Sequence, residues 1–294
     1  MSRLLKNKPL IITIIVCLLV IVALALAMNT RKPKKRHHIV YYPPFDHRRM
    51  VLDNYWLQAK LEVDRNVMDL LAQDKRELSS GLRLHKFMSG DPRKKVIALT
   101  IDDGPHPEFT PKILKILDEN GVKATFFVVG RMAENYPELV RAEEDAGHEI
   151  GNHTYDHLNL TELNNEDIAT EIESCGDVIK SITGERPHLF RPPGGDYDRD
   201  VAIVSEALGY TMVLWSDDTG DWDSPGESRI DRHMLRNVSN GGVILIHDGI
   251  PQTLDVLPRL IVDLKKRGYQ FVTVDQLMPA SARSTREADL LKKS

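Results

Sequence analysis

Residues 99–105 constrain the fold of this chain most, because an apolar run ends there in two adjacent carboxylates, Asp102 and Asp103, followed by Gly104. The pattern indicates a buried strand that delivers acidic side chains to a surface. Successive side chains of a strand point to opposite faces, so the two carboxylates share one environment only if the chain turns there, and we expect them to have different roles. The alternative is an ordinary strand end followed by an Asx turn.

A regular alternation of β-rich runs and amphipathic helical segments begins after Lys95. Thr110 and Pro111 form a clean helix start, and Gly121 is a plausible stop. Successive units of this kind predict an α/β fold with a parallel sheet, either open or closed into a (β/α) barrel. Seven strands are expected, over residues 96–101, 124–129, 148–152, 188–190, 211–215, 243–246 and 271–274.

The first 36 residues differ in character from the rest of the chain. Residues 10–28 form an apolar run without charge, long enough to cross a membrane as a helix, with basic residues on both sides. We expect 1–36 to be a cytoplasmic stub, an uncleaved transmembrane helix and a basic flank, with the catalytic domain extracytoplasmic. The Ala-Leu-Ala triplet at 25–27 resembles a signal-peptidase site, so a cleaved and secreted form is the alternative.

Three further segments follow this anchor. Residues 37–94 are expected to be a short helical stalk or an accessory helix packed on the main domain, with a helix over 51–78. The regular α/β pattern places the main domain at 95–278, and the polar residues 279–294 read as a flexible tail. The oligomeric state stays open.

Charge argues against one class of partner, and the cysteine content against a disulfide. The first 36 residues carry eight Lys or Arg and no acid, so the rest of the chain holds 31 basic and 43 acidic side chains. A domain this acidic repels phosphates, which argues against nucleic acid as a partner. Cys17 lies in the apolar run and Cys175 in an expected helix, and no disulfide is expected between them.

Ionisable side chains follow five of the seven expected strands. In α/β folds of this kind the chemistry gathers beyond the carboxyl ends of the strands. Chance alone does not readily explain ionisable side chains after so many strands. In chain order, the residues after these strands are Asp102 and Asp103, then His153 and His157, then Arg191, then Asp217, Asp218, Asp221 and Trp222, and then His247.

His153 and His157 lie four residues apart, so one turn brings both imidazoles to one point, where a carboxylate completes a facial set of metal ligands. A divalent metal there polarises a carbonyl and lowers the pKa of a bound water from 15.7 toward ~7, so hydrolysis is the expected reaction. One Asp of the pair is then free to act as general base, held ionised by Arg191, and these residues do not decide which Asp binds the metal. His247 is expected to protonate a leaving amine, unless Asp248 satisfies it in the turn.

Five motifs in this order resemble those of the polysaccharide deacetylases, the carbohydrate esterases with the NodB homology domain, over residues 95–276. They are Asp102-Asp103-Gly104-Pro105, His153-x-x-x-His157, Arg191-Pro192-Pro193-Gly194-Gly195, Asp218-x-x-Asp221-Trp222 and Ile244-x-x-His247. The resemblance implies a distorted (β/α) barrel that removes acetyl groups from N-acetylated sugars in peptidoglycan, chitin or related polymers. It also implies a divalent metal, usually Zn²⁺, although Co²⁺, Ni²⁺ or Mn²⁺ suit such ligands comparably.

The resemblance further implies roles for single residues. The implied metal ligands are Asp103, His153 and His157. The implied catalytic groups are Asp102 as base, Arg191 as the residue that orients it, His247 as acid and Asp221 as the residue that tunes the pKa of His247. The implied substrate-binding residues are Pro193, Gly194, whose backbone N–H helps stabilise the oxyanion, and Trp222, which walls the acetyl pocket.

The chain departs from the family pattern at four positions. Ile101, Leu158 and Ile244 stand where the family often has Phe, Pro and Leu, and all three keep apolar character. Gly194 stands where a Tyr is frequent, and its side chain cannot help line the sugar groove. Substrate preference is therefore what the resemblance defines least.

The leading hypothesis is a membrane-anchored, metal-dependent N-deacetylase acting on GlcNAc or MurNAc residues of cell-wall polysaccharide, with peptidoglycan favoured. One alternative is a catalytically silent glycan-binding protein on the same fold, which the presence of every ligand, the base and the acid argues against. Another is a small-molecule amidohydrolase or esterase. The aromatic residues Tyr155, Tyr197 and Trp215 suit a sugar cleft, or else belong to the core.

Overall fold

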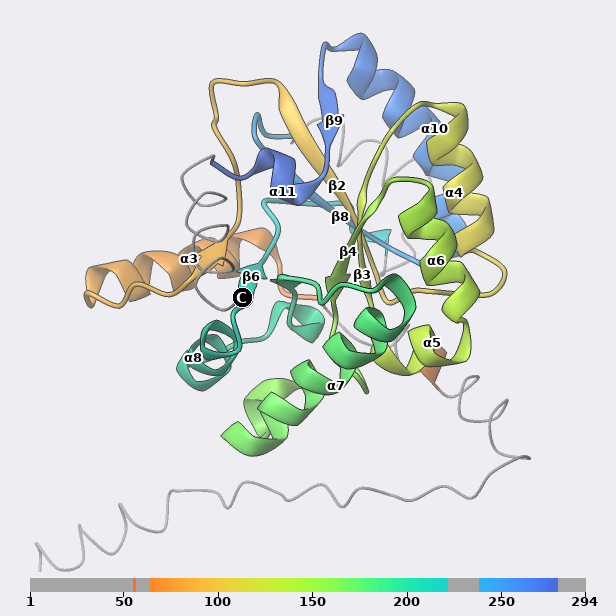
Figure 1. Cartoon of the computed structure of the whole chain (residues 1–294). Coiled ribbons are helices and arrows are strands. Elements are labelled where there is room, and N and C mark those ends of the chain that lie inside the picture. The colour runs from red at the N-terminus through yellow and green to blue at the C-terminus, as the bar shows by residue number, and fades with distance from the viewer. Residues whose placement is uncertain (1–54, 57–63, 222–237, 280–294) are drawn as a thin grey trace, which may run out of the picture. The chain divides into compact units, whose positions relative to one another are not determined.

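A parallel sheet organises the described part of the chain, which comprises residues 55–56, 64–221 and 238–279 of a computed structural model. Within these residues the strand order is β1-β6-β5-β4-β3-β2-β8-β7, and β9 pairs with β2 (Figure 1). The strands are β1 (Lys86–Phe87), β2 (Val96–Asp102), β3 (Thr125–Val128), β4 (Glu149–Asn152), β5 (Leu189–Phe190), β6 (Thr211–Val213), β7 (Asp217–Asp218), β8 (Val243–His247) and β9 (Gln270–Val272). The seven expected strands are confirmed. β1 and β7 were not predicted, because two residues are too few to show an alternation.

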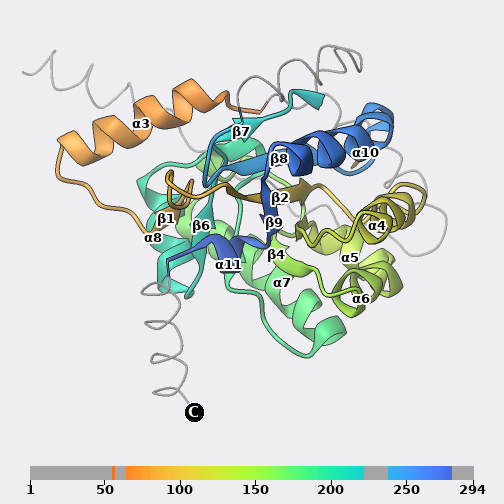
Figure 2. The same cartoon turned by 90° about the horizontal axis from the view of Figure 1, so that it is seen from above.

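Helices lie around the outside of the curved sheet, as Figures 1 and 2 show for α4, α6, α7, α8 and α10. α4 begins at Thr110 with Pro111 in its first turn, as predicted. The helices are α3 (Val67–Ser79), α4 (Thr110–Glu119), α5 (Gly130–Asn135), α6 (Pro137–Asp145), α7 (Asn165–Thr183), α8 (Arg199–Ala207), α10 (Pro251–Lys266) and α11 (Val274–Leu277), with short 3₁₀ turns η1 (Leu160–Glu162) and η2 (Pro193–Gly195).

Side chains of β2 alternate between two apolar cores. Ile97, Leu99 and Ile101 pack in a core that includes residues of α4, α6 and α10. Ala98 belongs to the other core, on the inner side of the curved sheet. Because alternate residues of a strand share a face, the line that starts at Ala98 continues through Thr100 and ends in the carboxylate of Asp102.

The expected barrel is in fact a half-barrel. The sheet ends at β1 and β7, and no strand pairing among the described residues joins these two edges. The chain after β1 meets the chain before β8 through a single antiparallel bridge between Ser89 and Gly242. Closing a barrel requires each edge strand to pair along a shared length, and two-residue strands at both edges offer too little backbone for that.

The helix expected over 51–78 is also corrected. Tyr55 and Trp56 are helical, but residues 64–66 are not, and α3 begins only at Val67. The side chain of Asn66 accepts a hydrogen bond of 3.0 Å from the backbone N–H of Asp69. An N-cap of this kind starts a new helix, so a continuous helix through this point is excluded.

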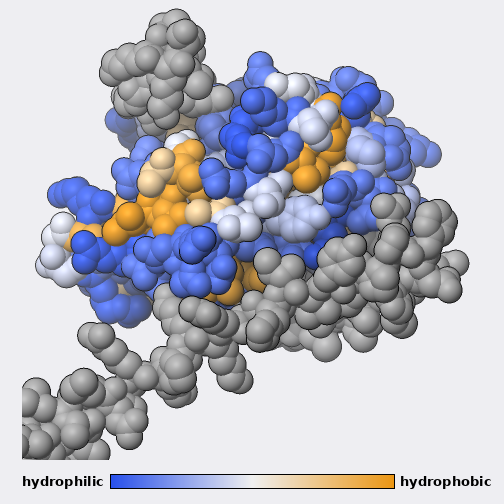
Figure 3. Space-filling model, turned by 60° about the horizontal axis from the view of Figure 1, so that its bottom comes forward, coloured by the Kyte–Doolittle hydropathy of each residue, from blue (hydrophilic) through white to orange (hydrophobic). Residues whose placement is uncertain are grey.

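Helix α3 packs on the domain with one face. Leu70 is fully buried in the inner core, and Lys86 of β1 forms an ion pair of 3.0 Å with Asp74 of α3. The other face carries Met68 and Leu71, which are 73% and 46% exposed. Figure 3 shows one face of the molecule, on which hydrophobic residues gather in separate patches bordered by hydrophilic ones. Within residues 64–94, the described end of this segment, α3 therefore packs on the domain.

The predicted anchor at 10–28, Cys17 and nearly all of the expected tail lie outside the described residues. None of the helices in the described ranges is long and apolar enough to cross a membrane. Cys175 is a free, buried thiol in α7.

Glu143 of α6 is a buried acid whose two carboxylate oxygens have no hydrogen-bond partner among the described residues. Burial, and next the charge of Asp248, raises the pKa of Glu143 well above its usual value. The native state therefore keeps a proton that the unfolded chain releases at lower pH. Stability that depends on this proton is present below the ordinary Glu pKa and falls as the pH rises above it.

We expect Glu143→Gln, which cannot ionise, to flatten this dependence. Between about pH 5 and pH 8 the melting temperature of the variant should fall less than that of the wild type, and at pH 8 it should be a few degrees higher. Calorimetry measures both. The control is Glu138→Gln in the exposed first turn of the same helix. Identical melting profiles for Glu143→Gln and the wild type would contradict the assignment.

Candidate active site

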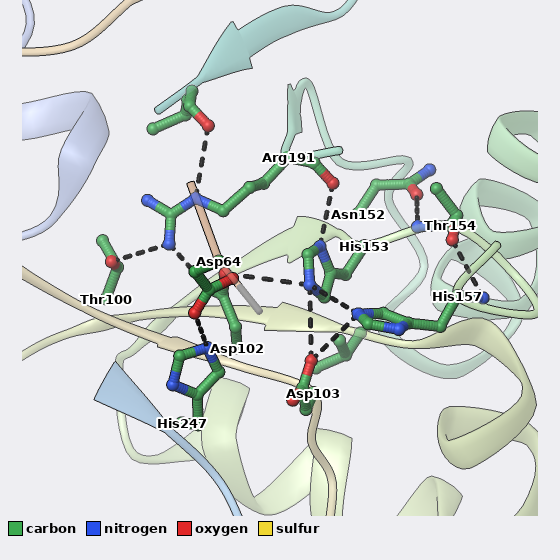
Figure 4. Close-up of polar contacts among 12 residues, drawn as sticks. Asp64, Thr100, Asp102, Asp103, Asn152, His153, Thr154, His157, Arg191 and His247 are labelled. Carbon is green, nitrogen blue, oxygen red and sulfur yellow. Dashed lines mark hydrogen bonds and ion pairs between the residues drawn. The ribbon is translucent and has the colours of Figure 1, made fainter. Parts of the chain in front are cut away.

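The register of the parallel strands gathers the ionisable residues at one end of the sheet. Asp102, the last residue of β2, is the direct partner of His247, the last residue of β8. Asn152 ends β4 and pairs with Phe190 of β5, so His153 and Arg191 follow at neighbouring strand ends. Figure 4 shows the side chains of Asp102, His153, Arg191 and His247 gathered around one centre. The predicted residues that meet here are Asp102, Asp103, His153, His157, Arg191, Asp221 and His247.

The turn predicted between the two carboxylates is present. Asp103 has φ of 73°, in the left-handed region that non-glycine residues rarely adopt, and Thr154 and His157 have φ of 65° and 56°. Side chains hold the loop after β4 that contains Thr154 and His157. Asn152 accepts from the N–H of Thr154 at 2.9 Å, and Thr154 Oγ1 accepts from the N–H of His157 at 3.1 Å. Backbone strain thus concentrates at the candidate site.

Three donor atoms converge on one point. The Nε2 atoms of His153 and His157 lie 3.2 Å apart, and Oδ1 of Asp103 lies 3.4 Å and 3.1 Å from them. Ligand atoms at the corners of a tetrahedron, each about 2.0–2.1 Å from a zinc ion, are about 3.3 Å from one another. The triad therefore has the dimensions of a site for a zinc-sized divalent cation.

The proton on His153 can be placed from its neighbours. Nδ1 of His153 lies 2.8 Å from the backbone oxygen of Arg191. A carbonyl oxygen only accepts hydrogen bonds, so Nδ1 is the donor and Nε2 is the nitrogen that faces the triad. A carbonyl behind a ligating histidine is the usual way in which proteins orient such a ligand. The chemistry of the donor set therefore fits a cation.

Asp102 is held by a buried arginine. Nη1 of Arg191 donates to Oδ1 of Asp102 at 2.7 Å and to Oγ1 of Thr100 at 2.8 Å, and the guanidinium lies 4.2 Å from the ring centroid of Phe127. Oδ2 of Asp102 is 3.7 Å from Nε2 of His153, so this oxygen faces the triad. Burial raises the pKa of Asp102, and the charge of Arg191 opposes the rise.

His247 is held by Asp221 from the other side. Nδ1 of His247 donates to Oδ1 of Asp221 at 2.9 Å, and Oδ2 of Asp221 accepts from the N–H of His247 at 2.8 Å and from Thr253 at 2.7 Å. Burial alone would lower the pKa of His247, but the carboxylates of Asp64 and Asp221 outweigh it and raise that pKa well above its usual value.

The alternative in which Asp248 satisfies His247 is wrong. The Asp248 carboxylate instead accepts from the hydroxyl of Thr110 and the N–H of His106, which holds the chain after β2. The two acids of β7, Asp217 and Asp218, likewise bond to backbone N–H groups of Ser239 and Gly220.

Two residues near the site escaped prediction. Oδ2 of Asp64 lies 3.1 Å from Nε2 of His247, and the hydroxyl of Tyr55 donates to the backbone oxygen of Asp103 at 3.0 Å. Both precede α3, far from any strand end. No motif or apolar period marks them, so only the tertiary structure could find them.

The glycines after Arg191 are needed for space and conformation. Gly194 has φ of 60° and Gly195 has φ of 69°, and a Cβ on Gly195 would lie 2.5 Å from the ring of Trp215. Gly194 follows Pro193 in η2, where both are buried. Trp222, the predicted wall of the acetyl pocket, lies outside the described residues.

The three aromatic residues that suited a sugar cleft have mainly structural surroundings. Trp215 and Tyr197 are 1% and 4% exposed and belong to the inner core, as the alternative predicted. Tyr155 is half-buried, and its hydroxyl donates to Glu134 at 2.7 Å.

The fold and the site together define a hydrolase of the parallel α/β half-barrel class, with its polar centre beyond the carboxyl ends of the strands. The family model described as polysaccharide deacetylase matches residues 89–213. Peptidoglycan-N-acetylglucosamine deacetylase of Bacillus cereus is 40% identical over 190 residues, which cover 63% of this chain and 89% of that relative. Peptidoglycan-N-acetylmuramic acid deacetylase PdaA of Bacillus subtilis is 35% identical over 196 residues, which cover 65% and 74%.

A solved structure agrees with these relatives. The crystal structure of the Bc1960 peptidoglycan N-acetylglucosamine deacetylase, in complex with an N-oxidanyl-benzamide, matches with a TM-score of 0.64 and 36% identity over 66% of this chain and 93% of that one. The chain belongs to the polysaccharide deacetylase family. It is a polysaccharide N-deacetylase, a hydrolase.

The two carboxylates should respond differently to the same substitution. We expect Asp103→Asn to weaken binding of Zn²⁺ more than about 100-fold, because it removes a charged ligand, and Asp102→Asn to change it only a few-fold. Calorimetric titration of the full chain with Zn²⁺ measures both. Equal losses in the two variants would mean that both carboxylates bind the cation.

Proposed function

We propose that this enzyme removes N-acetyl groups from GlcNAc or MurNAc residues of peptidoglycan, with a divalent cation held by Asp103, His153 and His157. The observation that carries the proposal is the convergence of their three donor atoms beside the Asp102–Arg191 and His247–Asp221 pairs. Zn²⁺ is the first candidate, and Co²⁺, Ni²⁺ and Mn²⁺ are the others. Such a cation polarises the acetyl carbonyl and acidifies a water molecule. The two relatives named above are both peptidoglycan deacetylases.

Asp102 acts as the general base in this proposal. Arg191 occupies its Oδ1, so Oδ2 is the oxygen that takes a proton from the attacking water. A carboxylate with a raised pKa is the better proton acceptor near neutral pH. Arg191 stays charged and keeps the carboxyl group in place before and after the proton arrives.

His247 acts as the general acid. Its Nδ1–H stays on Asp221, so Nε2–H is the proton that passes to the leaving nitrogen as the C–N bond breaks. The carboxylate of Asp221, which stays on Nδ1, raises the pKa of His247 and so favours the charged ring that an acid requires. One proton goes from water to Asp102, the remaining hydroxyl bonds to the acetyl carbon, and a proton from His247 goes to the nitrogen as the C–N bond breaks. The products are a free amine and acetic acid, which ionises to acetate in water.

Three substrate-binding residues complete the proposal. The backbone N–H of Gly194 stabilises the charge that develops on the acetyl oxygen, while Pro193 and Trp222 border the acetyl group. Because Gly194 has no side chain, it leaves room in the groove, and the choice between GlcNAc and MurNAc rests on other residues.

Acetate release tests the reaction. With Zn²⁺, the full chain should release acetate from a GlcNAc tetramer or from peptidoglycan, should stop when the metal is chelated and should recover when it is restored. Asp102→Asn should lower kcat at least about 100-fold, since it removes the base. The control is Asp118→Asn on the exposed face of α4. A wild-type rate in Asp102→Asn would rule out its role as base, and no acetate from the zinc-loaded enzyme would refute the reaction.

We also propose that residues 1–36 anchor the enzyme in the membrane with the catalytic domain outside, where peptidoglycan lies. The uncharged run at 10–28 supports this. In cells stripped of their wall, the full chain should sediment with membranes and be digested by protease added outside. Recovery in the medium would indicate the cleaved form, and recovery in the cytoplasm would contradict the proposal.

A further inference from the structure

Asp64 and Arg65, the two residues before Asn66 and α3, contact His247 and Gly194 at the candidate site. We call these two residues the strap. Oδ2 of Asp64 lies 3.1 Å from Nε2 of His247. The backbone N–H of Arg65 donates to the backbone oxygen of Gly194 at 3.0 Å. His247 ends β8 and Gly194 follows β5, so the strap joins two sides of the site that the proposed reaction uses together. Figure 4 shows Asp64 among the catalytic side chains.

The position of Asp64 conflicts with the proposed role of His247. Nδ1 of that ring is committed to Asp221, so Nε2 is the nitrogen left to serve a substrate. The carboxylate of Asp64 lies 3.1 Å from this nitrogen, so a leaving nitrogen cannot approach Nε2 from the same side while Asp64 stays there. The carboxylate also fills the place that the leaving group must take.

Polar contacts connect the strap to its neighbours. The ion pair between Asp64 and His247 is not aligned as a hydrogen bond. Oδ2 of Asp64 has no hydrogen-bond partner among the described residues. The side chain of Arg65 reaches Gln73 at 2.5 Å and Asp196 at 3.7 Å. Asp196 is 42% exposed, and exposed ion pairs contribute little stability. Breaking the contact between Arg65 and Asp196 therefore costs little free energy.

We propose that the strap is an autoinhibitory element, in which Asp64 competes with the sugar substrate for the leaving-group side of His247. This inference rests on the proposed function. An enzyme whose competent state is only partly populated binds its substrate more weakly by that fraction.

The test is Asp64→Asn in the zinc-loaded full chain, with GlcNAc oligomers as substrates. Because a saturating substrate also displaces an intramolecular competitor, we expect KM to fall about three- to tenfold and kcat to stay unchanged. The gain should be the same fold for a dimer and a hexamer, because the competent fraction is a property of the free enzyme. The matched control is Asp69→Asn, the same substitution at an exposed acid five residues later, which should leave KM and kcat as they are.

Either of two kinetic results would overturn the proposed autoinhibition by the strap. A fall in kcat would make Asp64 a residue that supports His247, and an unchanged KM would mean that it does not compete. A binding measurement separates this inference from the reaction itself. In an Asp102→Asn background, adding Asp64→Asn should tighten binding of the GlcNAc tetramer by the same three- to tenfold. Tighter binding without any acetate release from the wild type would support autoinhibition by the strap and refute the deacetylation. Unchanged binding would refute the autoinhibition.

Discussion

The buried pair of Arg191 and Asp102 is the interaction on which the rest of the site depends. A fully buried guanidinium loses its hydration, and removing the partner of such a charge costs about 3 to 5 kcal/mol. Thr100 and the ring of Phe127 supply further contacts. The same residue offers its backbone oxygen to His153. A single arginine therefore orients the candidate base with its side chain and a candidate ligand with its main chain.

The two histidines His153 and His247 have different partners at their ring nitrogens. His153 has a carbonyl oxygen behind Nδ1, which turns Nε2 toward Asp103 and His157. His247 has carboxylates on both nitrogens, which favour the charged ring. Histidine serves either purpose because its ordinary pKa lies near neutrality. The proposed roles, one ring as ligand of the cation and the other as acid, are consistent with these partners.

Much of this arrangement was predictable because it is local or repetitive. The apolar alternation of β2 and the acids at its end place Asp102 and Asp103, and the turn between them is seen in the positive φ of Asp103. Closure of the sheet was not predictable, since it depends on edge strands of two residues each. Nor was Asp64, whose partner His247 lies at the far end of the chain. Contacts of that kind are set by tertiary packing, which leaves no period in the sequence.

The central place of β2 in the sheet has a consequence for how the protein is made. β2 comes early in the chain, but β8 and β9, which pair with it, come near the end. A ribosome that has released the chain only as far as β4 has produced Asp102 without Arg191 or His247. Its apolar strands and unpaired carboxylates then have to wait for distant partners, and pairing across such separations is slow. Newly made chains should therefore depend on chaperones until the last strand emerges.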